Sequence, residues 1–243
     1  MEIIFTKTFE VPDEYVPKPA DKYIPDWYKN LESYIGGEKK PTGDGQTTGT
    51  VKRCMPVFDA VTGGYIIPTY VDIFVSKKQL FNGTTNEPTG KGIPWYEWPS
   101  FGPLGFHPIA QAPNHPSRKD LPEEAQYPKW INPWGIKTPP GYSVLFVQPF
   151  HRESPFNILP GVVDTDTYTS PVNFPFVLND WSFEGLIPAG TPMAQVIPFK
   201  RESWQMSIGE QAEFEEQTKV TTKLRTKFFD SYKSQYRQPK EYK

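Results

Sequence analysis

The sequence has almost no cysteine and no long apolar run. Cys54 is the single cysteine among 243 residues, so no disulfide can form within the chain. A chain without disulfides is typical of a reducing compartment, and we expect a cytoplasmic location, with Cys54 itself as a small buried side chain. No apolar segment approaches the ~18 residues that a membrane-spanning helix needs, and residues 1–10 lack the pattern of a signal peptide. No membrane partner is expected.

The sequence also lacks an excess of charge of either sign and has few histidines. It contains 26 Lys and Arg against 28 Asp and Glu, for a formal net charge of -2 and a pI of about 6.0. Such a balance gives no global field to attract a polyanion, so nucleic acid is not expected as a partner. His107, His115 and His151 are scattered along the chain rather than set at metal-ligand spacing, and their pattern predicts no metal centre.

Proline and aromatic residues, in contrast, are abundant. The chain has 28 prolines together with 7 tryptophans, 13 tyrosines and 17 phenylalanines. Proline-rich chains are often disordered, but disordered chains lack the aromatic side chains whose burial drives folding. The composition therefore predicts a folded protein in which prolines lie in loops and at strand ends.

The hydrophobic pattern predicts an all-β protein built as a distorted barrel or sandwich. Short apolar runs recur at regular spacing between turn residues, which favours antiparallel sheets over a parallel α/β sheet. Expected strands lie near 3–9, 51–60, 64–76, 141–148, 158–163, 172–178, 183–187 and 193–199, and a short helix near 26–31 should place Trp27 and Leu31 on one face.

We expect a single domain over 1–243, with its parts in a definite order. They are an N-terminal extension over 1–49, a β core over 50–79 and 135–204, a long irregular insertion over 80–134, and a C-terminal helix over 207–238. The insertion is rich in proline and tryptophan and has no sustained period. Its aromatic residues either hold the insertion together or stack on bases or sugars.

The C-terminal segment changes from β to helical periodicity. Ser207 and Glu210 have the spacing of a capping box, which predicts a helix beginning there. Apolar residues then recur every four positions, giving an amphipathic helix that packs on the same sheet or on a neighbouring subunit. The stripe consists of Val220, Leu224, Phe228, Tyr232 and Tyr236.

Residues 161–168, Gly-Val-Val-Asp-Thr-Asp-Thr-Tyr, resemble the β-hairpin of the dUTPase and dCTP-deaminase family (the β-clip superfamily). In that family an aspartate in this run activates the attacking water, and a tyrosine stacks on the sugar. The resemblance implies a catalytic role for Asp164, with Asp166 as a second carboxylate, and a substrate-binding role for Tyr168. Tyr168 stands one position later than in the family pattern.

Two flanking segments extend the resemblance to about a quarter of the chain. Residues 137–142 are similar to the strand entry before the hairpin, and residues 187–197 to the segment after it. Together they imply a dUTPase-like fold, with Gln195 supporting a substrate site. Thr191 and Pro192 replace an Asp-Arg pair of the family, and no glycine-rich arm follows Gly209.

The phosphate-binding segment of that family has a counterpart in residues 149–154. Here the resemblance implies that His151, Arg152 and Ser154 bind the phosphates of a substrate, since guanidinium and hydroxyl groups are suitable donors. Glu153 departs from the pattern and would repel phosphate. The resemblance further implies a Mg²⁺ cofactor, although no ligand spacing identifies its carboxylates, and a homo-oligomer, which in that family is a trimer.

Nearly the whole chain also resembles a family of proteins carried by tailed phages and some bacteria, which implies a host-cytoplasmic location but no activity. Two functions stay open. One is binding or hydrolysis of a nucleotide or related phosphorylated small molecule, as by a dUTPase-like diphosphatase. The other is a non-catalytic structural or accessory role, as in a virion, with Asp164 and Asp166 serving only to satisfy backbone N–H groups at a turn.

Overall fold

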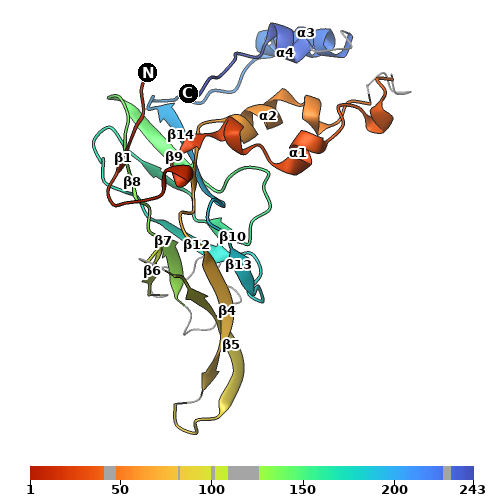
Figure 1. Ribbon diagram of the computed structural model, residues 1–243. Coiled ribbons are helices and arrows are strands. Elements are labelled where there is room, and N and C mark those ends of the chain that lie inside the picture. Colours follow the sequence, from red (N-terminus) through yellow and green to blue (C-terminus); the bar gives the residue numbers. More distant parts are fainter. Residues whose placement is uncertain (41–47, 82, 100–101, 109–125, 227–230) are drawn as a thin grey trace. The chain divides into compact units, whose positions relative to one another are not determined.

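The described residues form 14 strands and a few helices, so the predicted all-β character is confirmed (Figure 1). The structure is a computed structural model that describes residues 1–40, 48–81, 83–99, 102–108, 126–226 and 231–243. Where the sequence predicts one domain, the contacts divide the chain into two compact units. Unit 1 comprises residues 1–18 and 64–200, and unit 2 comprises residues 19–63 and 201–243.

Unit 1 contains the sheets. Their strand orders are β1-β8, β10-β12-β7-β6, β13-β4-β5 and β11-β9-β14-β3-β2. The strands are β1 (Ile4–Lys7), β3 (Tyr65–Pro68), β4 (Ile73–Phe81), β5 (Pro88–Glu97), β6 (Leu104–His107), β7 (Tyr127–Trp130), β8 (Trp134–Lys137), β9 (Tyr142–Val147), β10 (Phe156–Ile158), β11 (Gly161–Val163), β12 (Phe174–Leu178), β13 (Gly185–Ile187) and β14 (Pro192–Lys200). The short helix η1 (Asp13–Tyr15) also belongs here, and β2 (Lys18–Pro19) spans the boundary between the units.

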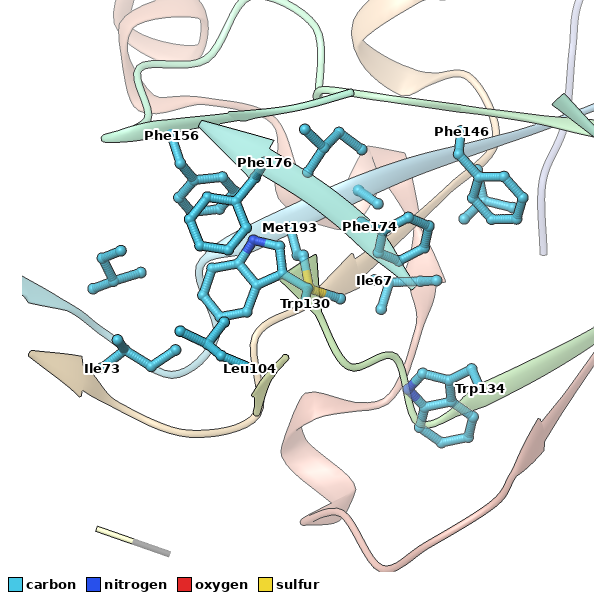
Figure 2. Close-up of a cluster of buried hydrophobic side chains, with 14 of the residues drawn as sticks. Ile67, Ile73, Leu104, Trp130, Trp134, Phe146, Phe156, Phe174, Phe176 and Met193 are labelled. Carbon is cyan, nitrogen blue, oxygen red and sulfur yellow. The ribbon is translucent and has the colours of Figure 1, made fainter. Parts of the chain in front are cut away.

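The core of unit 1 contains a group of packed aromatic rings. The Trp130 ring stacks on Phe176, with centroids 4.8 Å apart and planes 20° apart, and Phe156 lies 5.1 Å from Trp130 (Figure 2). All three side chains are almost fully buried. Since β6, β7, β9, β10, β12 and β14 all contribute to this one cluster, its burial holds the separate sheets together.

The described part of residues 80–134 is not irregular, contrary to the expectation. It forms β5, β6 and β7, and it supplies Tyr96, Leu104, Tyr127 and Trp130 to the core. The prolines in this segment are the reason that the sequence pattern predicts irregular structure in place of strands. Pro94 lies in β5, which among the described strands pairs only with β4 at the edge of its sheet, and there a missing N–H is tolerated. The rest of the expected insertion lies outside the described residues.

The expectation of a strand over 51–60 is wrong. Residues 51–53 form the short helix η4 (Val51–Arg53), and α2 (Met55–Thr62) follows it. Pro56 lies in the first turn of α2, where its missing N–H has no partner to lose, and Val57 and Val61 share a face at i, i+4 spacing. Cys54, which precedes α2, is exposed rather than buried.

Unit 2 holds the remaining helices, which are η2 (Ala20–Tyr23), α1 (Asp26–Asn30), η3 (Ile35–Gly37), η4, α2, α3 (Gln211–Thr226) and α4 (Ser231–Gln235). The expected short helix is confirmed as α1, but its buried residue is Tyr28, whose hydroxyl donates to the Lys52 carbonyl at 3.1 Å, while Trp27 is 42% exposed. Within the described ranges, no helix combines the length and apolar character needed to cross a membrane.

The structure describes two helical parts of the expected C-terminal helix, α3 and α4. Val220 and Leu224 of its apolar stripe lie on α3, Tyr232 lies on α4, and Phe228 lies outside the described residues. The cap is also three residues later than expected, because the Glu210 N–H donates to Glu213 Oε2 at 3.0 Å. A carboxylate at the start of a helix satisfies an otherwise unpaired N–H, and Glu213 does this where Glu210 was expected to.

The C-terminal segment after α4 is fixed to α2 by an ion pair. Arg237 donates to Asp59 Oδ1 through Nη2 at 2.7 Å and through Nε at 3.1 Å, and Lys240 Nζ lies 3.0 Å from Asp59 Oδ2. The Arg237 guanidinium also lies 5.7 Å from the Phe58 ring centroid. The hydrogen bonds from Arg237, followed by the contact with Lys240, hold the pKa of Asp59 below its usual value.

This lowered pKa gives a signed pH dependence. Because the folded pKa of Asp59 lies below its unfolded value of about 4, the stabilisation is present above that pH and is lost as pH falls through the folded pKa. We expect Asp59→Asn to lose protection of the α2 amides at pH 6 and to show a weaker change below pH 4 than wild type. Hydrogen exchange between pH 2.5 and 6 measures both. Asp21→Asn, at an exposed carboxylate beside Lys22, is the control, and an equal effect of the two variants would contradict the prediction.

Candidate functional site

The turn after β11 holds an exposed carboxylate beside an exposed ring. The N–H of Tyr168 donates to the Asp164 carbonyl at 2.8 Å, and the N–H of Thr167 donates to the same oxygen at 3.1 Å. These bonds close one helical turn, which brings the two ends of the segment together. Asp164 is exposed and Tyr168 is 51% exposed, so both side chains are accessible from solvent.

Hydrogen bonds to the neighbouring strand make this turn rigid. The Ser143 hydroxyl donates to Asp164 Oδ1 at 2.6 Å, and the Gly141 N–H donates to Asp166 Oδ2 at 2.8 Å. Beneath them, the buried hydroxyls of Thr138 and Thr165 lie 2.7 Å apart. Asp166 therefore has the structural role that the sequence left open, namely to satisfy a backbone N–H at a turn.

The loop expected to bind phosphate follows β9, and the buried side-chain amide of Gln195 holds its backbone in place. Gln195 is fully buried, and its Oε1 accepts from the Phe150 N–H at 3.0 Å. Gln195 thus supports this loop from below and does not itself reach solvent. Ser154 Oγ accepts from the Phe156 N–H at 3.3 Å, so Ser154 stabilises the return into β10.

The two basic residues of this loop differ in exposure. His151 is exposed and has a left-handed backbone conformation, with φ of 54°. Arg152 is half-buried, and its Nε and Nη2 atoms lie beneath the surface. His151 is therefore the more accessible of the two to a ligand, and Arg152 is held in the loop.

The hairpin turn and this loop lie at opposite ends of β9. In the antiparallel register, Val163 pairs with Val144 near the start of β9, whereas Gln195 pairs with Val147 at its end. Four residues separate Ser143, the partner of Asp164, from Val147, which corresponds to about 13 Å in a strand. Asp164 and Arg152 therefore lie toward opposite ends of β9.

A second candidate site, which the sequence did not single out, is a cavity beside the β4–β5 hairpin. Its volume is about 400 Å³ and most of its lining is aromatic. Tyr96 lines it and is 8% exposed; its hydroxyl is buried, and no hydrogen bond to it is present among the described residues. Such an unpaired group costs about 1–3 kcal/mol. The lining residues are Ile93, Pro94, Trp95, Tyr96, Trp98, Phe106, Gln126 and Trp181.

The signal for this cavity in the sequence was the density of aromatic residues near 95–106. These aromatic residues fall into two groups. Trp130 is part of the core, whereas Trp95, Trp98 and Phe106 line the cavity. Trp181 comes from a distant segment, the turn after β12, and only the tertiary structure places it beside them.

No cluster of three or more His, Cys, Asp or Glu side chains suited to a metal ion occurs in the described ranges. Asp164 and Asp166 are the acidic pair of the hairpin, and each uses one oxygen for a hydrogen bond within the protein. Mg²⁺ in nucleotide sites uses one or two carboxylates with substrate phosphates and water, so the residues of the turn fit such an ion only in the presence of a phosphorylated ligand.

None of the protein-family models searched matches this chain. A search of curated proteins also finds no match.

Proposed function

We propose that this protein binds a nucleotide or a related phosphorylated small molecule, and hydrolyses it, at a site shared between copies of the chain. The observation that carries the proposal is the turn after β11, which holds the exposed Asp164 carboxylate and the exposed Tyr168 ring one helical turn apart. A fixed carboxylate with access to water is suited to general-base catalysis, and a fixed ring to stacking on a sugar or base.

The residues have distinct roles in this proposal. Asp164 accepts a proton from the attacking water, and the Ser143 hydroxyl orients the carboxylate through Oδ1. Tyr168 stacks on the ligand. His151 and Arg152 bind phosphate, and Ser154 and Gln195 keep their loop in place. Mg²⁺ supplies charge neutralisation on the phosphates.

In this proposal a second copy of the chain bridges the separation along β9. Because Asp164 and Arg152 lie at opposite ends of the strand, the carboxylate of one copy would act on phosphates held by another. A homo-oligomer, with a trimer as the expected form, closes such sites around a symmetry axis. The hydrolase activity, the dUTPase-like fold and the association with phage all belong to this proposal.

The first test is hydrolysis of the deoxynucleoside triphosphates with Mg²⁺, measured by release of pyrophosphate or phosphate. We expect turnover by the wild-type protein and a loss of about 100-fold or more in Asp164→Asn, since a general base typically contributes that much. Glu184→Gln, at an exposed carboxylate elsewhere in unit 1, is the control and should keep full activity. No turnover of any triphosphate by the wild type would remove the hydrolase proposal.

The second test addresses the shared site. Asp164→Asn and Arg152→Met should each be inactive alone, whereas mixed oligomers of the two variants should recover part of the activity. Recovery is expected because some interfaces in a mixed oligomer pair an intact Asp164 with an intact Arg152. A monomer in light scattering, or no recovery after mixing, would contradict a site built from two copies.

A non-catalytic structural or accessory role is the second candidate. It is favoured by the way Asp166 and Ser154 satisfy backbone N–H groups, which is a sufficient reason for their presence. Under this alternative the wild-type protein hydrolyses no triphosphate and is found in purified virus particles. Turnover that depends on Asp164 would exclude it.

A further inference from the structure

We infer that the outer face of the sheet β13-β4-β5 is a self-association surface, on which a second copy of this chain packs about a two-fold axis. The inference is independent of the proposed function, because the turn after β11 and the loop after β9 contribute nothing to this sheet. The outer face carries Phe74, Ser76 and Lys78 of β4, Trp95 and Glu97 of β5, and Leu186 of β13, all within unit 1.

Large apolar side chains occupy the outer face although it is open to solvent. Successive side chains of a strand point to opposite faces, so Val75 is fully buried in the core whereas its neighbour Phe74 is 50% exposed. Leu186 pairs directly with Phe74 and is equally exposed, and Trp95, which pairs with Ser76, is 43% exposed. The outward face of an antiparallel sheet usually carries polar residues, and a contiguous exposed apolar patch commonly marks an interaction surface.

The charges of the outer face are arranged for contact with a copy of the same face. Lys78 follows Ser76 by two residues on β4, and Glu97 follows Trp95 by two residues on β5; both charged side chains are exposed. Because Ser76 pairs with Trp95 and the strands are antiparallel, the two charges lie on opposite sides of this pair. A two-fold axis that crosses the strands at the Ser76–Trp95 pair therefore places Lys78 of each copy opposite Glu97 of the other.

This charge pattern favours a second copy over a lipid surface as the partner. An anionic membrane would attract Lys78 but repel Glu97, whereas the turned copy offers each of them an opposite charge. The geometry is that of ordinary sheet packing, in which two faces lie about 10 Å apart with their strands within about 30° of each other. Lys78 Nζ lies 4.1 Å from the Trp95 ring centroid, so the ammonium is held over the centre of the face.

The size of the outer face sets the strength of the expected association. Three strands about 4.8 Å apart, over five residues of about 3.3 Å each, make a face roughly 15 Å across. Such an area is at the small end of specific interfaces, so we expect a dissociation constant in the micromolar range and a mass that depends on protein concentration.

The first experiment measures the mass of the full chain by light scattering and sedimentation at concentrations from about 1 to 200 μM, which bracket that range. Phe74→Glu buries a charge in the contact and should weaken self-association about tenfold or more, so that at high concentration its mass is half that of wild type. Phe81→Glu is the matched control. It changes the same side chain on the same strand, at a position that is 56% exposed and lies beyond the register shift after Gln79, and it should associate as wild type does.

The second experiment tests the two-fold axis through charge reversal. Lys78→Glu and Glu97→Lys each place like charges opposite one another, so each variant alone should associate more weakly than wild type. An equimolar mixture of the two variants should recover association, because Glu and Lys then face each other at both contacts. The double variant Lys78→Glu/Glu97→Lys should recover it as well. Loss of the Lys78–Trp95 contact alone would give no recovery in the mixture.

Thermal unfolding shows that the variants are folded, and since all three positions are exposed they should melt close to wild type. Asp164→Asn should have the mass of wild type, so failure of the proposed hydrolase leaves this inference standing. Equal masses of wild type and a folded Phe74→Glu, or no recovery in the mixture of charge variants, would overturn it. Binding of the wild type to anionic vesicles that is lost in Phe74→Glu, without self-association, would also overturn it.

Discussion

Replacement of Trp130 by alanine is expected to lower the free energy of unfolding of unit 1 by about 3–5 kcal/mol. Trp130 is 1% exposed and stacks on Phe176 at 4.8 Å, and β7, on which it lies, is paired with both β12 and β6. The variant loses the apolar contact of the indole and leaves a cavity that neighbouring rings fill only in part. Urea unfolding followed by near-ultraviolet circular dichroism measures the change.

Two controls make this prediction specific to packing. Trp204→Ala removes the same side chain from a position that is 88% exposed and should change the free energy of unfolding by less than about 0.5 kcal/mol. Trp130→Phe keeps a ring in the core and removes an indole N–H that has no hydrogen-bond partner in the described chain, so its cost should be well below that of alanine. Equal destabilisation by Trp130→Ala and Trp204→Ala would show that the aromatic core is not what holds the sheets.

Replacement of Gly64 by alanine should be comparably destabilising, for a different reason. Gly64 has φ of +72°, and a Cβ there would lie 2.0 Å from the Val196 carbonyl oxygen in β14. Alanine would therefore incur about 1–2 kcal/mol for the left-handed conformation. It would also force β3 and β14 apart, which adds about 1–3 kcal/mol of the kind seen on overpacking. Thermal unfolding of the full chain measures the loss.

Gly141→Ala is the matched control for Gly64→Ala. Gly141 has a similar φ of +82°, but nothing lies within 4 Å of its Cβ position. It should therefore show the conformational cost alone, and the difference between the two variants isolates the close approach of β3 and β14. If both variants unfold at the same temperature, the close approach is not a determinant of stability.

The C-terminal strands of unit 1 were the best predicted part of the fold. Runs such as residues 141–148 and 193–199 correspond to β9 and β14, because their apolar residues are continuous and are bounded by turn residues. Residues 51–60 show the opposite case. Their valines have β propensity, but Pro56 in a first turn and the i, i+4 spacing of Val57 and Val61 favour a helix.

The candidate residues were predicted with uneven success. Hydrogen bonds between residues close in sequence form the turn that holds Asp164 and Tyr168 one helical turn apart. The location of His151, Arg152 and Ser154 relative to that turn depends on the β9 register, which pairs residues distant in sequence and which composition does not reveal.

The sequence by itself determined that the protein is built mainly of β-strands, where its later strands lie, and that its aromatic residues support a folded core. The tertiary structure decided which tryptophans are packed and which line a cavity, and that the acidic turn and the basic loop lie at opposite ends of one strand. The physical reason is that strand formation follows from short-range pattern, whereas pairing and burial depend on contacts between segments such as Trp181 and β5, which the chain order does not specify.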